Sequence, residues 1–170
     1  RRIRADFNLY AGYDRGDTGP SKHPAVITIA AVAPDRTPLA GDVFVFYEYV
    51  ADAVEDVGDM ARHLIEDLAI LCDHPSIQEA ARLLKESQAP GLPETVAWNL
   101  RQKAGGSIPF KTCNGSHEAL GERKTLRMKW GLPVKAGKPG KTEGLDQLHH
   151  YCKVENAPHP FYPHIHGRTN

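Results

Sequence analysis

Three apolar runs in the first eighty residues each carry an acidic residue at a position where it could do chemistry. Asp14 ends the run from Phe7, Glu48 lies inside the run Val43 to Val50, and Asp73 follows the run Leu68 to Cys72. Hard divalent cations such as Mg²⁺ and Mn²⁺ prefer carboxylate oxygens as ligands. If strands bring these acids to one sheet edge, we expect a site that holds divalent metal ions.

Glu48 is the most constrained of these acids. Because strand side chains alternate between two faces, Glu48 is predicted to share a face with Phe44, Phe46 and Val50. An ionised carboxylate on such a face is costly unless it is paired or bound to a metal. The alternative is that Glu48 lies near a strand end and reaches solvent or an arginine.

Asp14 and Asp146 have ordinary alternatives of their own. Asp14 could cap the turn towards Gly16, and Asp17 is a nearby competitor for the same role in a metal site. Asp146, close to Glu143, stands early in an expected short helix, where an acid is favoured by the helix dipole alone.

Charge is divided along the chain although the net charge is zero. Residues 1–100 hold 9 Lys+Arg and 16 Asp+Glu, a balance of −7, and residues 101–170 hold 12 and 5, a balance of +7. Such a division suits an enzyme acting on nucleic acid, and it also suits two halves that attract each other. The candidate contacts to a DNA backbone lie in an expected basic helix and in a Gly/Lys/Pro loop: Arg123, Lys124, Arg127, Lys135, Lys138 and Lys141.

The cysteines and histidines point to no firm site. Three widely spaced cysteines argue against a disulfide framework and a structural zinc ribbon. His164 and His166, with His149, His150 or Cys152, could bind a soft transition metal, but the spacing favours surface histidines or a docking tail. Gly140-Lys141-Thr142 lacks the earlier glycine of a phosphate-binding loop, since Lys135 stands there.

The spacing of apolar residues along the sequence predicts the strands and helices that must position these residues. Three strands, Phe7–Asp14, Ala25–Ala33 and Val43–Val50, form an expected antiparallel meander. A helix follows from Val54, and residues 68–72 either continue it or form a short buried strand, the interpretation we favour. A Ser76/Glu79 capping box starts a helix to Ser87, which leaves Asp73 free of capping.

The second half is predicted as alternating elements. They are a short helical piece at 94–103, a strand at Ile108–Thr112, a basic helix at His117–Trp130, a loop at 134–141, a helix at Thr142–Val154 and an irregular His/Pro-rich tail at 155–170. The fold class expected is α/β, of the ribonuclease-H-like type, with a mixed sheet of about five strands flanked by helices. We expect a single domain, soluble and without a membrane span, and a fragment of a longer chain.

Four short motifs carry a resemblance to a known family. They are Gly12-Tyr13-Asp14-Arg15-Gly16 with Pro24-Ala25-Val26, Tyr47-Glu48-Tyr49, Ile70-Leu71-Cys72-Asp73, and Gly144-Leu145-Asp146-Gln147-Leu148. Together they resemble the nuclease domain of the large terminase subunit of tailed phages.

The resemblance implies a metal-dependent DNA endonuclease that acts in the host cytoplasm and lacks the ATPase motor of a full terminase. It implies that Asp14, Glu48 and Asp73 are catalytic, that these and Asp146 bind two Mg²⁺ or Mn²⁺ ions, and that the partners are double-stranded DNA and other terminase or portal subunits. The alternatives are another ribonuclease-H-like nuclease, such as a resolvase or transposase-like enzyme, and a non-catalytic nucleic-acid-binding or assembly module.

Overall fold

The computed structural model of the protein describes residues 2–14, 24–36, 38, 40–51, 57–115, 120–137 and 161–169. Its strands are β1 (Asn8–Asp14), β2 (Ala25–Val32), β3 (Val43–Ala51), β4 (Phe110–Gly115), β5 (Lys135–Ala136) and β6 (Phe161–Thr169). Its helices are α1 (Val57–Leu71), α2 (Pro75–Ser87), α3 (Glu94–Gly106) and α4 (Leu120–Trp130). No helix among the described residues is both long and apolar enough to cross a membrane.

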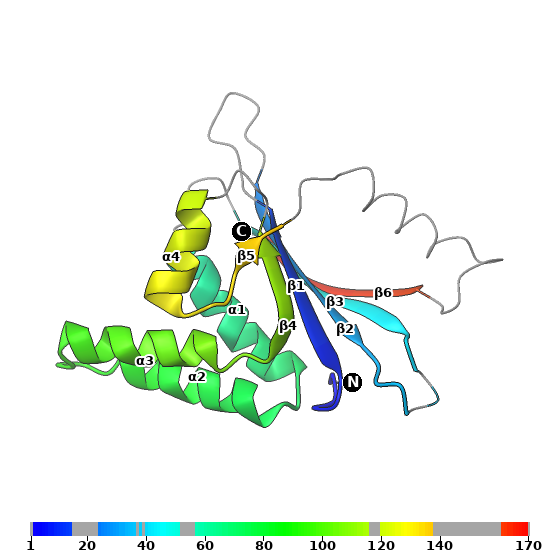
Figure 1. The fold of residues 1–170 in the computed structure, drawn as a ribbon. Coiled ribbons are helices and arrows are strands. Elements are labelled where there is room, and N and C mark those ends of the chain that lie inside the picture. Colours follow the sequence, from blue (N-terminus) through cyan, green and yellow to red (C-terminus); the bar gives the residue numbers. More distant parts are fainter. Residues whose placement is uncertain are drawn as a thin grey trace.

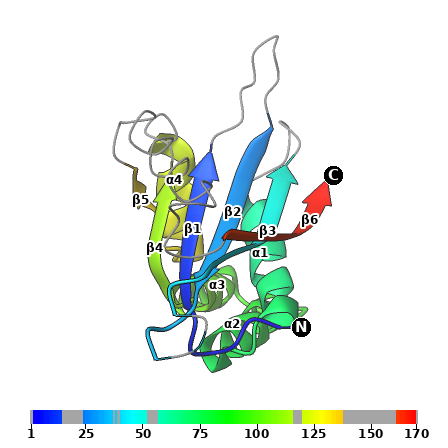
Figure 2. The ribbon, with the colours of Figure 1, turned by 90° about the vertical axis from the view of Figure 1, so that its right-hand side faces the viewer.

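The six strands form one mixed sheet in the order β5-β4-β1-β2-β3-β6. β2 is antiparallel to β1 and β3, whereas β1 with β4, β4 with β5, and β3 with β6 are parallel pairs. Every strand except β2 therefore runs in the same direction (Figure 2). The predicted α/β class with a mixed sheet is confirmed, and the sheet has six strands among the described residues where about five were expected.

All four helices cover one face of this sheet (Figure 1). The buried faces of β1 and β2 carry Leu9, Ala11, Tyr13, Ile27, Ile29 and Ala31. The apolar face of α1 packs against them through residues that include Leu64, Ile65 and Leu68, each at most 2% exposed. Alternation along the strands and a helical period along α1 thus produce one core between the two layers.

A β-bulge in β3 overturns the predicted face of Glu48. The ladder with β2 pairs Ile29 with Tyr47 but Ala30 with Val45, so Phe46 is an extra residue. Because a one-residue shift exchanges the faces, Phe44 packs with the core beside the helices while Glu48 lies on the opposite, helix-free face. Glu48 therefore does not share a face with Phe44.

Residues 68–72 are not the strand that the sequence analysis favours. The helix α1 continues to Leu71, and the Cys72 amide donates to the Leu68 carbonyl at 2.9 Å. The helical spacing of Met60, Leu64 and Leu68 extends to Cys72, which is buried and forms only an isolated bridge with Ile3. The helical period prevails because it buries one continuous face.

The start of α2 also differs in its cap. His74, not Ser76, occupies the N-cap, and its Nδ1 accepts a hydrogen bond from the Ser76 amide at 3.2 Å. Pro75 fills the first helical position, where a missing amide hydrogen costs nothing. The predicted capping box at Ser76 and Glu79 is therefore wrong.

The end of the chain departs from the predicted irregular tail. Residues 161–169 form β6, an edge strand parallel to β3. The register shifts between Val45 and Tyr47, next to the pair Val45 and Pro163, and edges and bulges are the places where a sheet tolerates proline. The predicted helix at 142–154 and the rest of the predicted tail, 155–160, lie outside the described residues.

Candidate functional site

The carboxyl ends of three parallel strands meet at one edge of the sheet. β1 ends at Asp14, β3 at Ala51 and β4 at Gly115, and Figure 2 shows their arrowheads together at this edge. Ligands of open α/β sheets bind outside the carboxyl ends of strands. We refer to this edge as the carboxyl edge, and it is the natural place for a site.

Asp14 and Glu48 lie on the same face of the sheet near the carboxyl edge. Val26 of β2 pairs with Asp14 on one side and with Val50 on the other. Thr28, two residues farther from the carboxyl edge along β2, pairs with Glu48. The two acids thus stand two strands apart, with a lateral backbone separation of about 10 Å. The Asp14 residue is exposed and Glu48 is half-buried. This is the face that carries none of the four helices (Figure 1).

Asp73 does not join this pair. It follows α1, whose 15 residues run about 22 Å back from the carboxyl edge, and its amide donates to the Ile3 carbonyl at 2.8 Å. Its carboxylate pairs with Arg2 at 3.0 Å, with about half of each side chain exposed. The predicted convergence of Asp14, Glu48 and Asp73 is wrong, because the continued helix carries Asp73 to the opposite edge.

The described residues contain no group of three or more His, Cys, Asp or Glu side chains that could hold a metal ion. Asp146, the fourth predicted ligand, and its competitor Asp17 lie outside the described residues. Of the alternative metal set, His164 and His166 belong to β6, whereas His149, His150 and Cys152 lie outside the described residues. Two carboxylates of the predicted four are therefore placed at one site.

Asn114 is a possible member of this site that the sequence pattern did not indicate. Asn114 pairs with Gly12, and Gly12 pairs with Thr28, so a row crosses four strands from Asn114 to Glu48. Asn114 is exposed and offers a neutral amide oxygen. The predicted strand ended at Thr112, and only the extension of β4 to Gly115 reveals Asn114 as a strand residue.

A hydrogen-bonded network holds β3, and so Glu48, from the helix side. The Tyr47 hydroxyl donates to Asp67 Oδ2 at 3.1 Å, and both residues are buried. The Tyr49 hydroxyl lies 2.9 Å from His63 Nδ1. Because both α1 partners belong to a well-packed helix, these contacts lock the part of β3 that carries Glu48.

The predicted DNA-binding residues divide by exposure. Arg123 is 7% exposed, and its side chain lies so close to Gly115 that a Cβ there would be 2.7 Å from Arg123 Cδ. It is a packed residue, so little of its side chain is available to a DNA surface. Lys124, Arg127 and Lys135 are exposed. Lys138 and Lys141 lie outside the described residues.

Lys124 and Arg127 line a depression of about 710 Å³ beside β5. The exposed apolar residues Leu120 and Met128 belong to its lining as well. A surface with both cationic and apolar side chains can contact the phosphates and sugars of a nucleic acid.

No protein-family model matches this chain, and no curated protein matches it. One solved structure to which the chain is similar is the nuclease domain of the large terminase from bacteriophage SPP1, with bound Mn. The TM-score is 0.47 and the sequence identity 12%, over 92% of this chain and 60% of that one. The chain thus spans about three fifths of the length of the structure that it resembles in the course of its backbone.

Proposed function

We propose that this chain is a metal-dependent endonuclease that hydrolyses phosphodiester bonds in double-stranded DNA, like the packaging nuclease of the terminase family. The observation that carries the proposal is the placement of Asp14 and Glu48 on one open face at the carboxyl edge of a ribonuclease-H-like sheet. That edge is where strand ends deliver ligands in this class of fold.

The two carboxylates suit Mg²⁺ or Mn²⁺, which prefer hard oxygen donors. Asp14 and Glu48 would hold the metal, and Asp146 is proposed as a further ligand. When bound, a pair of such ions supplies an activated water and stabilises the charge that develops on the leaving oxygen. Asn114 offers an additional oxygen or an amide donor towards the substrate.

The surface beside these acids can accept a nucleic-acid backbone. A Cβ at Gly12 would meet no heavy atom within 4 Å. The position between Asn114 and Thr28 on this face of the sheet is therefore open space. A phosphodiester can approach the sheet closely where no side chain stands. Lys135 of β5 and, on the helix side of the sheet, Lys124 and Arg127 of α4 are proposed to contact phosphates farther along the duplex, because such contacts position a duplex without reading its sequence.

A second candidate is a nucleic-acid-binding or assembly module that cleaves nothing. It is favoured by the observation that the described residues bring two acids, not three or more, to the site. Assembly with other terminase or portal subunits is proposed from the family resemblance.

A plasmid-nicking assay in Mg²⁺, Mn²⁺ or EDTA separates the two candidates. We expect cleavage with either metal, none in EDTA, and a loss of at least about a hundredfold in Asp14→Asn, because a neutral amide is a poor ligand for hard cations. The matched control is Asp73→Asn, which removes an acid at the opposite edge and should cleave as the wild type does. Full activity of a folded Asp14→Asn variant would contradict the nuclease proposal.

A further inference from the structure

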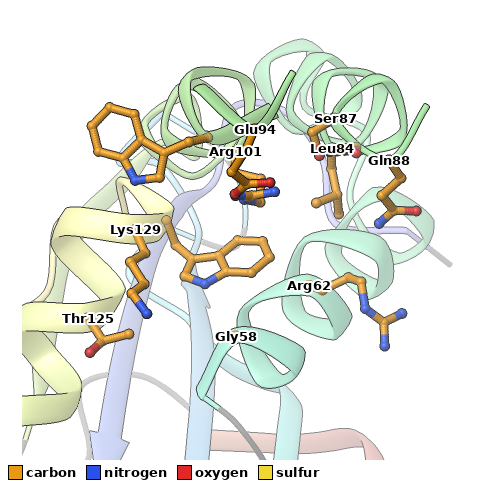
Figure 3. A pocket seen from close by; sticks show the side chains of 11 residues that line it. Gly58, Arg62, Leu84, Ser87, Gln88, Glu94, Arg101, Thr125 and Lys129 are labelled. Carbon is orange, nitrogen blue, oxygen red and sulfur yellow. Dashed lines mark hydrogen bonds and ion pairs between the residues drawn. The ribbon is translucent and has the colours of Figure 1, made fainter. Parts of the chain in front are cut away.

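A groove of about 410 Å³ lies in the helical layer, on the other face of the sheet from Asp14 and Glu48. All four helices contribute to its lining, with Gly58 of α1, Ser87 of α2, Arg101 of α3 and Thr125 of α4 among the lining residues (Figure 3). Its volume falls in the range of small-ligand sites and is too small for a duplex. The proposed nuclease site makes no use of it.

Two tryptophans give the groove an aromatic character. Trp98 of α3 is 40% exposed, and Trp130 at the end of α4 is half-buried against the core. An indole held in place by a core is a rigid, flat platform, and an exposed indole is available for stacking.

Charged side chains also line the groove. Its lining holds Arg62, Arg101 and Lys129, with Glu94 as the single acid. Arg101 is ion-paired with Glu94, and the two side chains lie together in Figure 3. Arg62 pairs with acids of its own helix, at 3.4 Å from both Asp59 and Glu66. These pairs leave Lys129 as a cation with no acid partner in the part of the chain that the structure describes.

Lys129 stands one helical turn from Thr125, so α4 presents an ammonium group and a hydroxyl group on the same side of the groove. Both groups donate hydrogen bonds to phosphate oxygens, and the ammonium adds charge. The aromatic platform and the phosphate donors thus come from different helices that meet at one groove.

We propose that this groove binds an unpaired strand of nucleic acid, with a base stacked on Trp98 and a phosphate held by Lys129 and Thr125. Aromatic platforms in positively charged grooves bind single strands with little regard to sequence. An acidic peptide could also meet the cations, but it offers no aromatic ring at every residue to stack on the indole. The proposal does not depend on cleavage, since the groove and the acids lie on opposite faces of the sheet.

The test is the fluorescence anisotropy of a labelled oligothymidine titrated with the whole chain in EDTA. Trp98→Leu should weaken binding at least about fivefold, whereas Trp98→Phe should keep most of the affinity. Lys129→Gln should lower the slope of log K against log salt by about 0.7, the value for one contact on a single strand. Lys111→Gln, an exposed lysine outside the groove, is the matched control and should bind as the wild type does.

Melting temperatures equal to that of the wild type would show that the variants are folded. Unchanged binding by Trp98→Leu would overturn the proposal, as would displacement of the oligonucleotide by polyglutamate at equal affinity, which would indicate an acidic polypeptide partner. A protein that nicks no plasmid yet binds oligothymidine through Trp98 would support this inference and contradict only the nuclease proposal.

Discussion

Glu48 is half-buried, and it lies on a strand that Tyr47 and Tyr49 tie to α1 by hydrogen bonds on the opposite face. Its cross-strand neighbours are Thr28 and Gly167, which carry no charge, and no ion pair of Glu48 is found among the described residues. A half-buried carboxylate without a partner costs stability unless a cation compensates it. Measuring protein stability with and without a divalent cation therefore distinguishes a metal ligand from an ordinary surface acid.

We therefore expect Glu48→Gln to stabilise the metal-free protein by up to about 1 kcal/mol, since an amide loses less on desolvation than a carboxylate. In a domain of this size such a gain raises the melting temperature by about 2–4 °C. Millimolar Mn²⁺ should stabilise the wild type and leave the variant unaffected, because a ligand stabilises only the state that binds it. An equal response to Mn²⁺ in both proteins would argue that Glu48 binds no metal.

The two described cysteines are predicted to be inert. Burial raises the pKa of both Cys72 and Cys113 from 9.0 to about 12, and Arg2 opposes the effect at Cys72. Since the thiolate is the reactive form, alkylation of native protein at mildly alkaline pH should be slow at both thiols and fast in urea. Mass spectrometry of the peptides would show whether either thiol is alkylated rapidly in the native protein, which would contradict the prediction.

These thiols also have a consequence for stability. The unfolded thiols lose their protons near pH 9 and the native ones near pH 12, so the unfolded state binds fewer protons between these values. Their contribution is complete below about pH 9 and is lost as the pH rises towards 12. Replacing Cys113 by Ala should make the free energy of unfolding fall less steeply in this window.

At the scale of elements, the contact between α3 and α4 depends on Gly105. A Cβ at Gly105 would lie 1.7 Å from the Trp130 carbonyl oxygen, whereas a Cβ at the adjacent Gly106 would lie 3.7 Å from the Gly131 oxygen. The first contact is impossible without separating two helices, and the second is an ordinary van der Waals contact.

Gly105→Ala should thus destabilise the protein by about 3 kcal/mol, and it should also widen the groove that Trp98 and Trp130 line. Gly106→Ala, the control one residue away, should be neutral or stabilising by about 0.5 kcal/mol, because alanine restricts the unfolded chain. Urea denaturation of both variants measures the difference. Equal stabilities would show that the helices do not approach each other at Gly105.

The bulge in β3 interrupts the alternation of side chains that the sequence predicts for this strand. Strict alternation placed Glu48 and Phe44 on one face, and one inserted residue, Phe46, put them on opposite faces. Apolar residues on both sides of a bulge look the same in sequence as an uninterrupted strand. Only pairing with β2, which fixes the register, reveals the extra residue.

At the scale of the whole molecule, the basic second half is expected to provide the electrostatic part of DNA binding. Replacing the exposed Lys124, Arg127 and Lys135 together by Ala should weaken duplex binding equally for all sequences. It should flatten the slope of log K against log salt by up to about 2.7, or 0.9 for each lost phosphate contact. Cleavage at saturating DNA should persist, since none of the three is an expected metal ligand.

Salt titrations of the wild type and of the triple variant would test this surface. Arg123→Ala is not a suitable control, because Arg123 is buried and its loss would disturb packing against Gly115. Lys111→Ala removes an exposed lysine on β4, away from the α4 depression, and should leave the slope unchanged. An unchanged slope of log K against log salt in the triple variant would show that the duplex does not contact these three residues.

The sequence by itself determined the strands β1 to β3, the α/β class and the places of Asp14 and Glu48 near strand ends. These features follow from local periodicity, since alternation marks a half-buried strand and turn residues mark its ends. The helix from Ser76 was also visible, although its cap, His74, was not. Local patterns carry this information because neighbouring residues share one element.

Only the tertiary structure decided which of the candidate residues meet. It moved Asp73 to the opposite edge through the full length of α1, buried Arg123 against β4, and paired residues 161–169 with β3. It also brought Trp98, Arg101 and Lys129 to one groove from different helices. A sequence pattern does not encode these distances, because they depend on how elements far apart in the chain pack and on the register in which strands pair.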